Sequence, residues 1–208
     1  MIQGCGFRSF VLAFLLLFST CTTARITIHA TGLQPPLCKS QAVPPRTAVV
    51  WGTAWRENQK EKDLRESMAG HAIEAYFKKQ SCVSTIQIVK MIEGRRAIEH
   101  SDIELLKWAR SGPNPVDSLI LLRVEELGPL IILYPSPILW EGGSEVSLRV
   151  RVLNVRTSSL ETDTSIQWKD TGAFVLRGTG PLERNLETVL TSVFGQSQLI
   201  EQFDPIGP

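Results

Sequence analysis

The sequence has few of the groups that catalysis or metal binding requires. Its only histidines are His29, His71 and His100, and no spacing among them places two on one metal ion. Serine-hydrolase elbows, phosphate-binding loops, dinucleotide-binding glycine motifs and zinc-protease motifs do not occur. The sequence therefore predicts a protein that is not an enzyme, holds no metal and needs no cofactor.

The chain also lacks a charge imbalance. It has 22 lysines and arginines against 21 aspartates and glutamates. Residues 1–20 contain one of these charged groups, Arg8, so a chain without them has equal numbers of both signs. A domain with no net charge has no electrostatic attraction to a phosphate backbone, and we expect no nucleic-acid partner.

No apolar run at the amino terminus is long enough to cross a bilayer. The run from Phe10 to Phe18 follows Arg8 and fits the apolar core of a secretory signal peptide. It leads into Phe18-Ser-Thr-Cys21, which resembles the lipobox of bacterial lipoproteins, although those proteins favour Leu at the first position and Gly or Ala before the cysteine. The resemblance implies cleavage before Cys21 and acylation of Cys21, with palmitate among the acyl chains. A rival cut after Ala24 would give a soluble secreted protein.

Cysteine is scarce, with four residues in the chain. Cys5 leaves with the signal peptide and Cys21 is either lipidated or removed, so both cuts leave Cys38 and Cys82. A pair of cysteines in an oxidising compartment indicates a disulfide. The alternative is two unrelated thiols.

The sequence divides into four segments. Residues 1–20 are the signal peptide, and residues 21–46 form a lipidated tether that is stiffened by prolines and contains a short edge strand near residues 25–29. Residues 47–194 form an α/β periplasmic domain, and residues 195–208 form a carboxyl-terminal tail.

Alternating side chains indicate the sheet of this domain. In residues 145–153, Val146, Leu148, Val150 and Val152 fall on one face, whereas Ser147, Arg149 and Arg151 fall on the other. The apolar residues 118–124 precede them and predict a strand at the centre of the sheet. Ile166 and Trp168 continue the alternation after it. We expect these strands to form an antiparallel meander.

Three helices are predicted beside the sheet. An apolar stripe runs through residues 64–77, Ser101 and Glu104 form a capping box for a helix through Arg110, and a last helix spans residues 182–194. The prediction is an α/β single-domain sandwich with a mixed, partly antiparallel sheet and about three helices. We expect all three helices on one face, which leaves the face with Arg149, Arg151, Gln167 and Lys169 in solvent.

The order of these elements resembles the envelope lipoprotein families built on the TolB amino-terminal type of fold. They include the curli secretion lipoprotein, the lipoprotein activator of penicillin-binding proteins and the Pel polysaccharide lipoprotein. Leu153-Asn-Val-Arg-Thr157 is similar to the Asp-Val-Arg-Thr-Gly turn of those families, with Asn154 in place of Asp and Ser158 in place of Gly. The resemblance implies a domain of the bacterial envelope that acts through contacts with other proteins.

An aromatic and apolar triplet is the remaining candidate site. Ile138, Leu139 and Trp140 lie in a segment from Tyr134 to Gly143, whose prolines predict a loop outside the sheet. An exposed apolar triplet meets a partner subunit or a lipid surface. The alternative is that Trp140 folds back over the core.

Together these features predict a non-enzymatic lipoprotein on the periplasmic face of the bacterial outer membrane. It would act as an accessory in envelope assembly or secretion, with other envelope proteins or further copies of itself as partners and with its lipid anchor in the membrane. The alternative is a soluble periplasmic module that binds a glycan or a peptide.

Overall fold

The computed structural model describes residues 23–31, 44–80, 85–90, 101–135 and 140–195, which form three helices and one six-stranded sheet. The strands are β1 (Thr23–Thr31), β2 (Arg46–Thr53), β3 (Thr85–Lys90), β4 (Ser118–Leu133), β5 (Trp140–Asn154) and β6 (Ser159–Ala173). The helices are α2 (Lys62–Lys78), α4 (Asp102–Ser111) and α5 (Leu182–Phe194). The predicted α/β class, with a mixed sheet and three helices, is confirmed.

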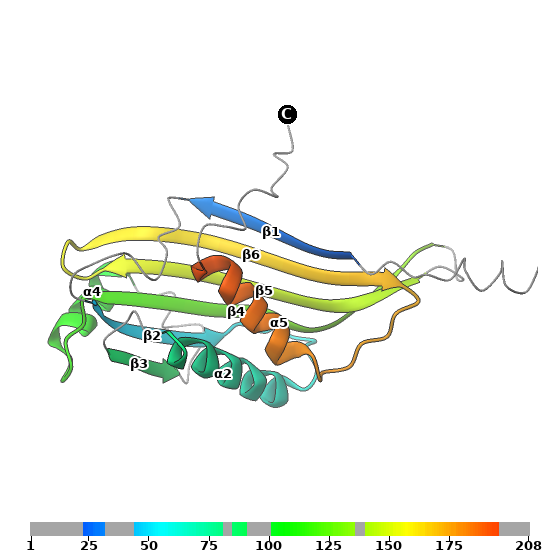
Figure 1. Cartoon of the computed structure of the whole chain (residues 1–208), viewed down its shortest axis with the longest axis horizontal. Helices are drawn as coiled ribbons and strands as arrows, with labels where there is room; N and C mark the ends of the chain where they lie inside the picture. The colour runs from blue at the N-terminus through cyan, green and yellow to red at the C-terminus, as the bar shows by residue number, and fades with distance from the viewer. Residues whose placement is uncertain (1–22, 32–43, 81–84, 91–100, 136–139, 196–208) are drawn as a thin grey trace, which may run out of the picture.

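The sheet is built around β4, in the strand order β1-β6-β5-β4-β2-β3 (Figure 1). β4 pairs in parallel with β2 on one side and antiparallel with β5 on the other. β5, β6 and β1 continue as antiparallel neighbours, whereas β3 adds in parallel to β2. The predicted meander is therefore the antiparallel half of the sheet, and the predicted edge strand within residues 21–46 is β1.

Helices α2 and α5 cover one face of the sheet (Figure 1). Ile73 and Phe77 of α2 and Leu186 of α5 are fully buried in one apolar cluster, together with Val146, Leu148, Val150 and Val152 of β5. Phe77 and Phe194 meet edge to face with ring centroids 5.5 Å apart. The alternation read from residues 145–153 therefore identifies the helix-facing side of β5.

The expectation that all three helices share one face is wrong, because α4 packs against the opposite face. Its Leu105, Leu106 and Ala109 form a second apolar cluster with alternate residues of β2 and β4. Those strand residues are Ala48, Val50, Leu119 and Leu121. β2 and β4 are apolar on both faces here, and a strand buried on both faces needs cover on both. The predicted capping box of Ser101 and Glu104 begins α4.

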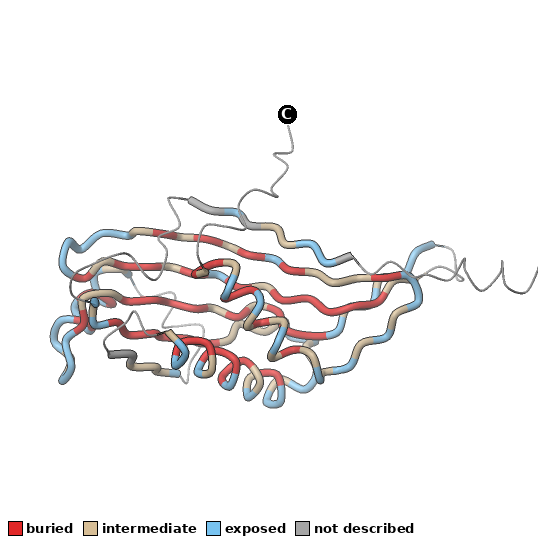
Figure 2. Tube along the Cα trace, viewed as in Figure 1, coloured by how far each residue is buried: buried red, intermediate tan, exposed pale blue. Residues whose placement is uncertain are grey.

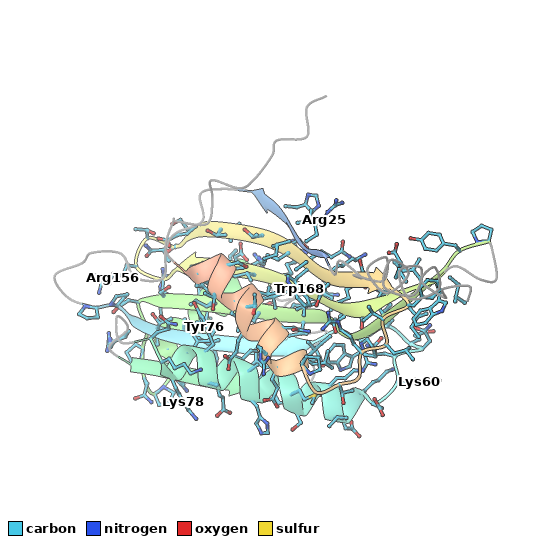
Figure 3. The ribbon with its side chains drawn as sticks, turned by 45° about the vertical axis from the view of Figure 1, so that its right-hand side comes forward. Arg25, Lys60, Tyr76, Lys78, Arg156 and Trp168 are labelled. Carbon is cyan, nitrogen blue, oxygen red and sulfur yellow. The ribbon has the colours of Figure 1, made fainter. Side chains whose placement is uncertain are left out.

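A carboxylate joins three strands at the end of the sheet that α4 covers. Asp117, just before β4, accepts 3.0 Å hydrogen bonds from the backbone N–H of Arg46 and from Nε of Arg156. Figure 3 shows Arg156 at the end of the sheet away from the β4–β5 hairpin. The arginine in Leu153-Asn-Val-Arg-Thr157 therefore has a structural role in this chain. Ser158, where the similar families carry Gly, has a φ of 59°, a conformation that glycine favours.

We expect Asp117→Asn to lower the free energy of unfolding at pH 7 by about 1 kcal/mol, a value reduced for solvent screening. The hydrogen bond from Arg156 lowers the pKa of Asp117 from 3.8 to about 2 in the folded protein. The carboxylate therefore stabilises the fold above pH 4, and this contribution disappears as the pH falls toward 2. Chemical denaturation between pH 7 and pH 2 should show a shallower acid decline for Asp117→Asn than for the unsubstituted chain, and equal slopes would contradict the assignment.

Candidate functional site

β4 and β5 continue beyond the helices as a hairpin whose far part carries exposed apolar side chains. We call this part the hairpin end and define it as residues 130–134, Trp140 and Glu141 of β5, and residues 173–176. Within it, Ile131 is 56% exposed, Leu133 79%, Phe174 52% and Leu176 76%. Exposed apolar side chains gathered at one end of a domain mark an interaction surface.

The exposure begins where the helices no longer cover β4. Residues 119–122 and 126–128 of β4 are buried, whereas residues 129–133 alternate between exposed and half-buried. Figure 2 shows the buried trace along the middle of the sheet and exposed residues where the hairpin projects. The part of β4 that belongs to the hairpin end is therefore strand that no described helix covers.

A buried ion pair fixes the base of the hairpin. The pairing of β4 with β5 shifts between Val124 and Glu126, and Glu126 lies 3.4 Å from Nη1 of Arg65 on α2. The same Nη1 donates a 2.9 Å hydrogen bond to the carbonyl oxygen of Leu127. A side chain at Gly128 would collide with this guanidinium, since an added Cβ would lie 1.7 Å from Nη1. The glycine therefore lets α2 hold the hairpin against the domain.

We expect Arg65→Ala to lower the free energy of unfolding by about 2 kcal/mol, because the buried Glu126 carboxylate then keeps only Gln59 and the exposed Arg56 as partners. Arg184→Ala is the matched control, since Arg184 is exposed on α5 and should change stability by less than about 0.5 kcal/mol. Urea denaturation of both variants measures the difference. Equal losses would show that the Arg65 contact does not support the fold.

Two glycines let β6 and the chain that follows it lie close to β5. An added Cβ would lie 1.8 Å from the carbonyl oxygen of Val175 at Gly142, and 1.9 Å from that of Asp170 at Gly143. The close approach brings Phe174 against Trp140, edge to face with ring centroids 5.7 Å apart. The backbone N–H of Phe174 donates a 3.2 Å hydrogen bond to the carbonyl oxygen of Trp140.

These contacts border an open depression of about 270 Å³ at the hairpin end. Its walls are Tyr134, Trp140, Glu141, Ala173 and Phe174. A hydrogen bond from the Tyr134 hydroxyl to the Glu141 carboxylate raises the pKa of Tyr134. Three aromatic rings and one carboxylate thus share a single recess, which we call the aromatic pocket.

The structure places one of the six residues predicted as sites. Trp140 is half-buried at the hairpin end and pairs with Leu133 of β4. The expected loop from Tyr134 to Gly143 is therefore wrong for residues 140–143, because a β-ladder includes them despite the prolines before them. Cys21, Cys38, Cys82, Ile138 and Leu139 lie outside the described residues, so their predicted roles stay predictions.

Sequence reasoning missed most of the hairpin end. The apolar run Leu130-Ile-Ile-Leu133 could have identified Ile131 and Leu133 as part of a strand, but it follows Pro129 directly. Phe174 gave no signal, because its place beside Trp140 depends on the pairing of β5 with β6.

The sheet face beside α4 is a network of ion pairs on β5 and β6. Arg149 donates to both carboxylate oxygens of Asp163, at 2.9 and 2.8 Å, and this pairing lowers the pKa of Asp163. Arg151 pairs with Asp102 of α4, and Glu145 lies 3.5 Å from the Nζ of Lys169. The cations predicted to lie in solvent are therefore neutralised by neighbouring carboxylates.

The part of the chain that the structure describes has neither a cluster of metal-ligand side chains nor a helix that could cross a membrane. It contains no group of three or more histidine, cysteine, aspartate or glutamate side chains that could hold a metal ion. Its helices are also too short or too polar for any of them to cross a membrane. On the surface of α2, Nδ1 of His71 lies 3.5 Å from a carboxylate oxygen of Glu183 on α5. His29 is exposed on β1.

No model of a known protein family matches the sequence, and no curated protein matches it. Solved structures that are similar to this chain include the PelC dodecamer from Paraburkholderia phytofirmans. It is 17% identical with a TM-score of 0.44, and the match covers 83% of this chain and 100% of that one. Lipoprotein GNA1162 from Neisseria meningitidis is 13% identical with a TM-score of 0.37, covering 73% and 100%. A neuraminyllactose-binding hemagglutinin homolog from Helicobacter pylori is 9% identical with a TM-score of 0.36, covering 82% and 93%.

A PelC structure and a lipoprotein are thus among the solved structures similar to this chain. The resemblance to envelope lipoprotein families stays a prediction for this chain. The link to the TolB type of fold stays a prediction.

Proposed function

We propose that this protein is a lipoprotein of the bacterial envelope whose domain rests its hairpin end on the membrane that holds the Cys21 anchor. The observation that carries the proposal is the position of β1, the first described segment after Cys21. β1 begins at the same end of the sheet at which the exposed apolar hairpin projects (Figure 1).

The strand register shows which residues of the four strands lie in line with the start of β1. Thr23 pairs with Thr171 of β6, Thr171 pairs with Gly143 of β5, and Gly143 pairs with Leu130 of β4. The first residue of β1 therefore stands in one row across the sheet with the start of the hairpin end. One residue, Thr22, lies between Cys21 and Thr23. Two residues of chain span at most about 7 Å. A lipid on Cys21 would hold this end of the sheet at the membrane surface.

The chemistry of the hairpin end suits that position. Ile131, Leu133, Phe174 and Leu176 are exposed, and burying one such side chain fully is worth about 1.5–3 kcal/mol. Trp140 and Tyr134 combine an apolar ring with a polar atom, a combination typical of side chains at the boundary between lipid and water. A lipid surface beside an anchor would cover these residues without a dedicated protein partner.

The position of β1 also bears on the two signal-peptide cuts. A cut before Cys21 keeps all of β1, from Thr23 to Thr31. A cut after Ala24 would remove Thr23 and Ala24, which pair with Thr171 and Asp170. A cut before Cys21 keeps these strand pairs, so the structure of β1 favours the lipoprotein over the soluble binding module.

Membrane contact leaves the rest of the domain for protein partners. β1 and β3 are the two edges of the described sheet, and strand edges pair readily with another chain. We infer an accessory role in envelope assembly or secretion through such contacts, with further copies of this chain among the partners. The outer membrane is the proposed location.

Mass spectrometry of the mature amino terminus, from protein expressed in a bacterial host, should find Cys21 as the first residue with acyl chains attached. The short apolar run and the Ser-Thr-Cys sequence lead to this expectation. An unmodified terminus at Arg25 would instead support the soluble periplasmic module for a glycan or peptide.

Leu133→Asp should reduce membrane association of the mature chain that starts at residue 21 and carries Cys21→Ser in place of the anchor. We expect at least about a ten-fold weaker partition into lipid vesicles, because the change removes an apolar contact and adds a charge at the bilayer. Vesicle flotation measures the partition, and thermal unfolding checks that the domain stays folded.

Leu160→Asp is the matched control. Leu160 is an exposed leucine of the same sheet, but it pairs with Leu153 at the end away from the hairpin end. The control should float with vesicles as the parent does. Equal flotation of both aspartate variants would refute contact of the hairpin end with the membrane.

A further inference from the structure

The aromatic pocket differs from the other apolar parts of the hairpin end because it contains a carboxylate. Tyr134, Trp140 and Phe174 supply three rings, and Glu141 lies among them in a recess of about 270 Å³. A depression that served only apolar contact would have no use for a negative charge in its wall. The combination therefore points to a ligand with both an apolar surface and a positive charge.

Aromatic rings and a carboxylate attract a cation for separate reasons. The face of an aromatic ring is electronegative and attracts an ammonium group within about 6 Å. A carboxylate adds charge attraction and accepts hydrogen bonds from N–H donors. Where these groups line one recess, as in the aromatic cages that bind organic ammonium ions, the two attractions act on the same cation.

The Glu141 carboxylate is available for such a cation. Across the described residues, no lysine or arginine forms an ion pair with it, whereas Glu126, Glu145 and Asp163 all have cationic partners. Its hydrogen bond comes from the Tyr134 hydroxyl, a neutral donor that brings no positive charge to the carboxylate.

We propose that the aromatic pocket binds the primary ammonium group of a zwitterionic phospholipid headgroup. The assignment to a lipid rests on the proposed function, which sets the hairpin end against the membrane. The exposed Phe174 lines the pocket within the hairpin end, so a membrane against the hairpin end would bring the headgroups to the pocket. A primary ammonium group donates hydrogen bonds to Glu141 while its neighbouring methylene groups contact the rings.

The test of the pocket uses soluble headgroup probes and the mature chain that starts at residue 21 with Cys21→Ser. Glycerophosphoethanolamine carries the ammonium group, and glycerophosphoglycerol is the probe without it. The chain has five tryptophans, and Trp140→Phe identifies which indole N–H signal in the NMR spectrum belongs to Trp140. We expect glycerophosphoethanolamine to shift that signal in a saturable manner and glycerophosphoglycerol to leave it unchanged.

Two variants separate the charge of the pocket from its rings. Glu141→Gln should weaken glycerophosphoethanolamine binding about ten-fold, because it removes the charge but keeps the size of the side chain. Phe174→Leu should weaken it about two- to five-fold through the loss of one ring face. Glu57→Gln, at an exposed glutamate outside the pocket, is the matched control and should bind as the parent does. Unchanged binding in Glu141→Gln, in a variant with an unchanged melting temperature, would overturn the proposal.

Vesicle flotation then distinguishes this inference from the proposed function. We expect Glu141→Gln to lose affinity for vesicles rich in phosphatidylethanolamine but not for vesicles of phosphatidylglycerol, whose anionic headgroups gain no attraction from a carboxylate. If Leu133→Asp releases the chain from both kinds of vesicle while Glu141→Gln changes neither, the pocket assignment fails and the membrane contact stands. If the soluble probe binds but no vesicle does, the ammonium group comes from another source, such as a lysine side chain of a protein partner, and the lipid assignment is overturned.

Discussion

The structure depends on the burial of β4 on both of its faces. Ile120 and Leu122 face the cluster beneath α2 and α5, whereas Leu119 and Leu121 face the cluster beneath α4. A strand that is apolar on both faces is stable only between two covering layers. Its two edges must also pair with neighbouring strands. This requirement places β4 at the centre, with β2 in parallel on one side and β5 antiparallel on the other.

The lengths of helix and strand determine what remains uncovered. A strand advances about 3.3 Å per residue and a helix about 1.5 Å, so the 16 residues of β4 extend over roughly 53 Å while the 17 residues of α2 extend over roughly 26 Å. Helices of this length cannot cover such strands from end to end. Because α2 is held at the base of the hairpin by Arg65 and Glu126, the uncovered part is the hairpin end. The apolar exposure there follows from geometry, and its position beside the start of β1 connects it to the predicted anchor.

The charges of the domain show a related division. Where the sheet is covered or its strands meet, cations and carboxylates pair closely, as Arg149 does with Asp163 and Arg156 with Asp117. Pairing of this kind neutralises the surface and agrees with the even balance of charge in the sequence. Glu141 has no such cation among the described residues. Its neighbours are aromatic rings, which give the carboxylate a different chemical setting from the rest of the domain.

The sequence by itself determined those features that depend on residues close together in the chain. The capping box of Ser101 and Glu104, the helix over residues 182–194 and the alternation through residues 145–153 all follow from contacts within a few positions, and all are present in the structure. The α/β class and the position of β4 at the centre also followed, because burial of an apolar strand does not depend on which helices cover it.

Tertiary structure alone decided which face each helix covers and which side chains form the candidate site. The stripe of α4 is apolar on one side in the sequence, but only the two-sided burial of β2 and β4 requires it to pack opposite α2 and α5. The extent of β4 was hidden because Glu125, Glu126 and Pro129 interrupt its pattern, and pairing with β5 restores the strand beyond them. Tyr134, Trp140 and Phe174 meet because strand register and close backbone approach at Gly142 and Gly143 bring distant segments together, and neither is encoded within a local window of sequence.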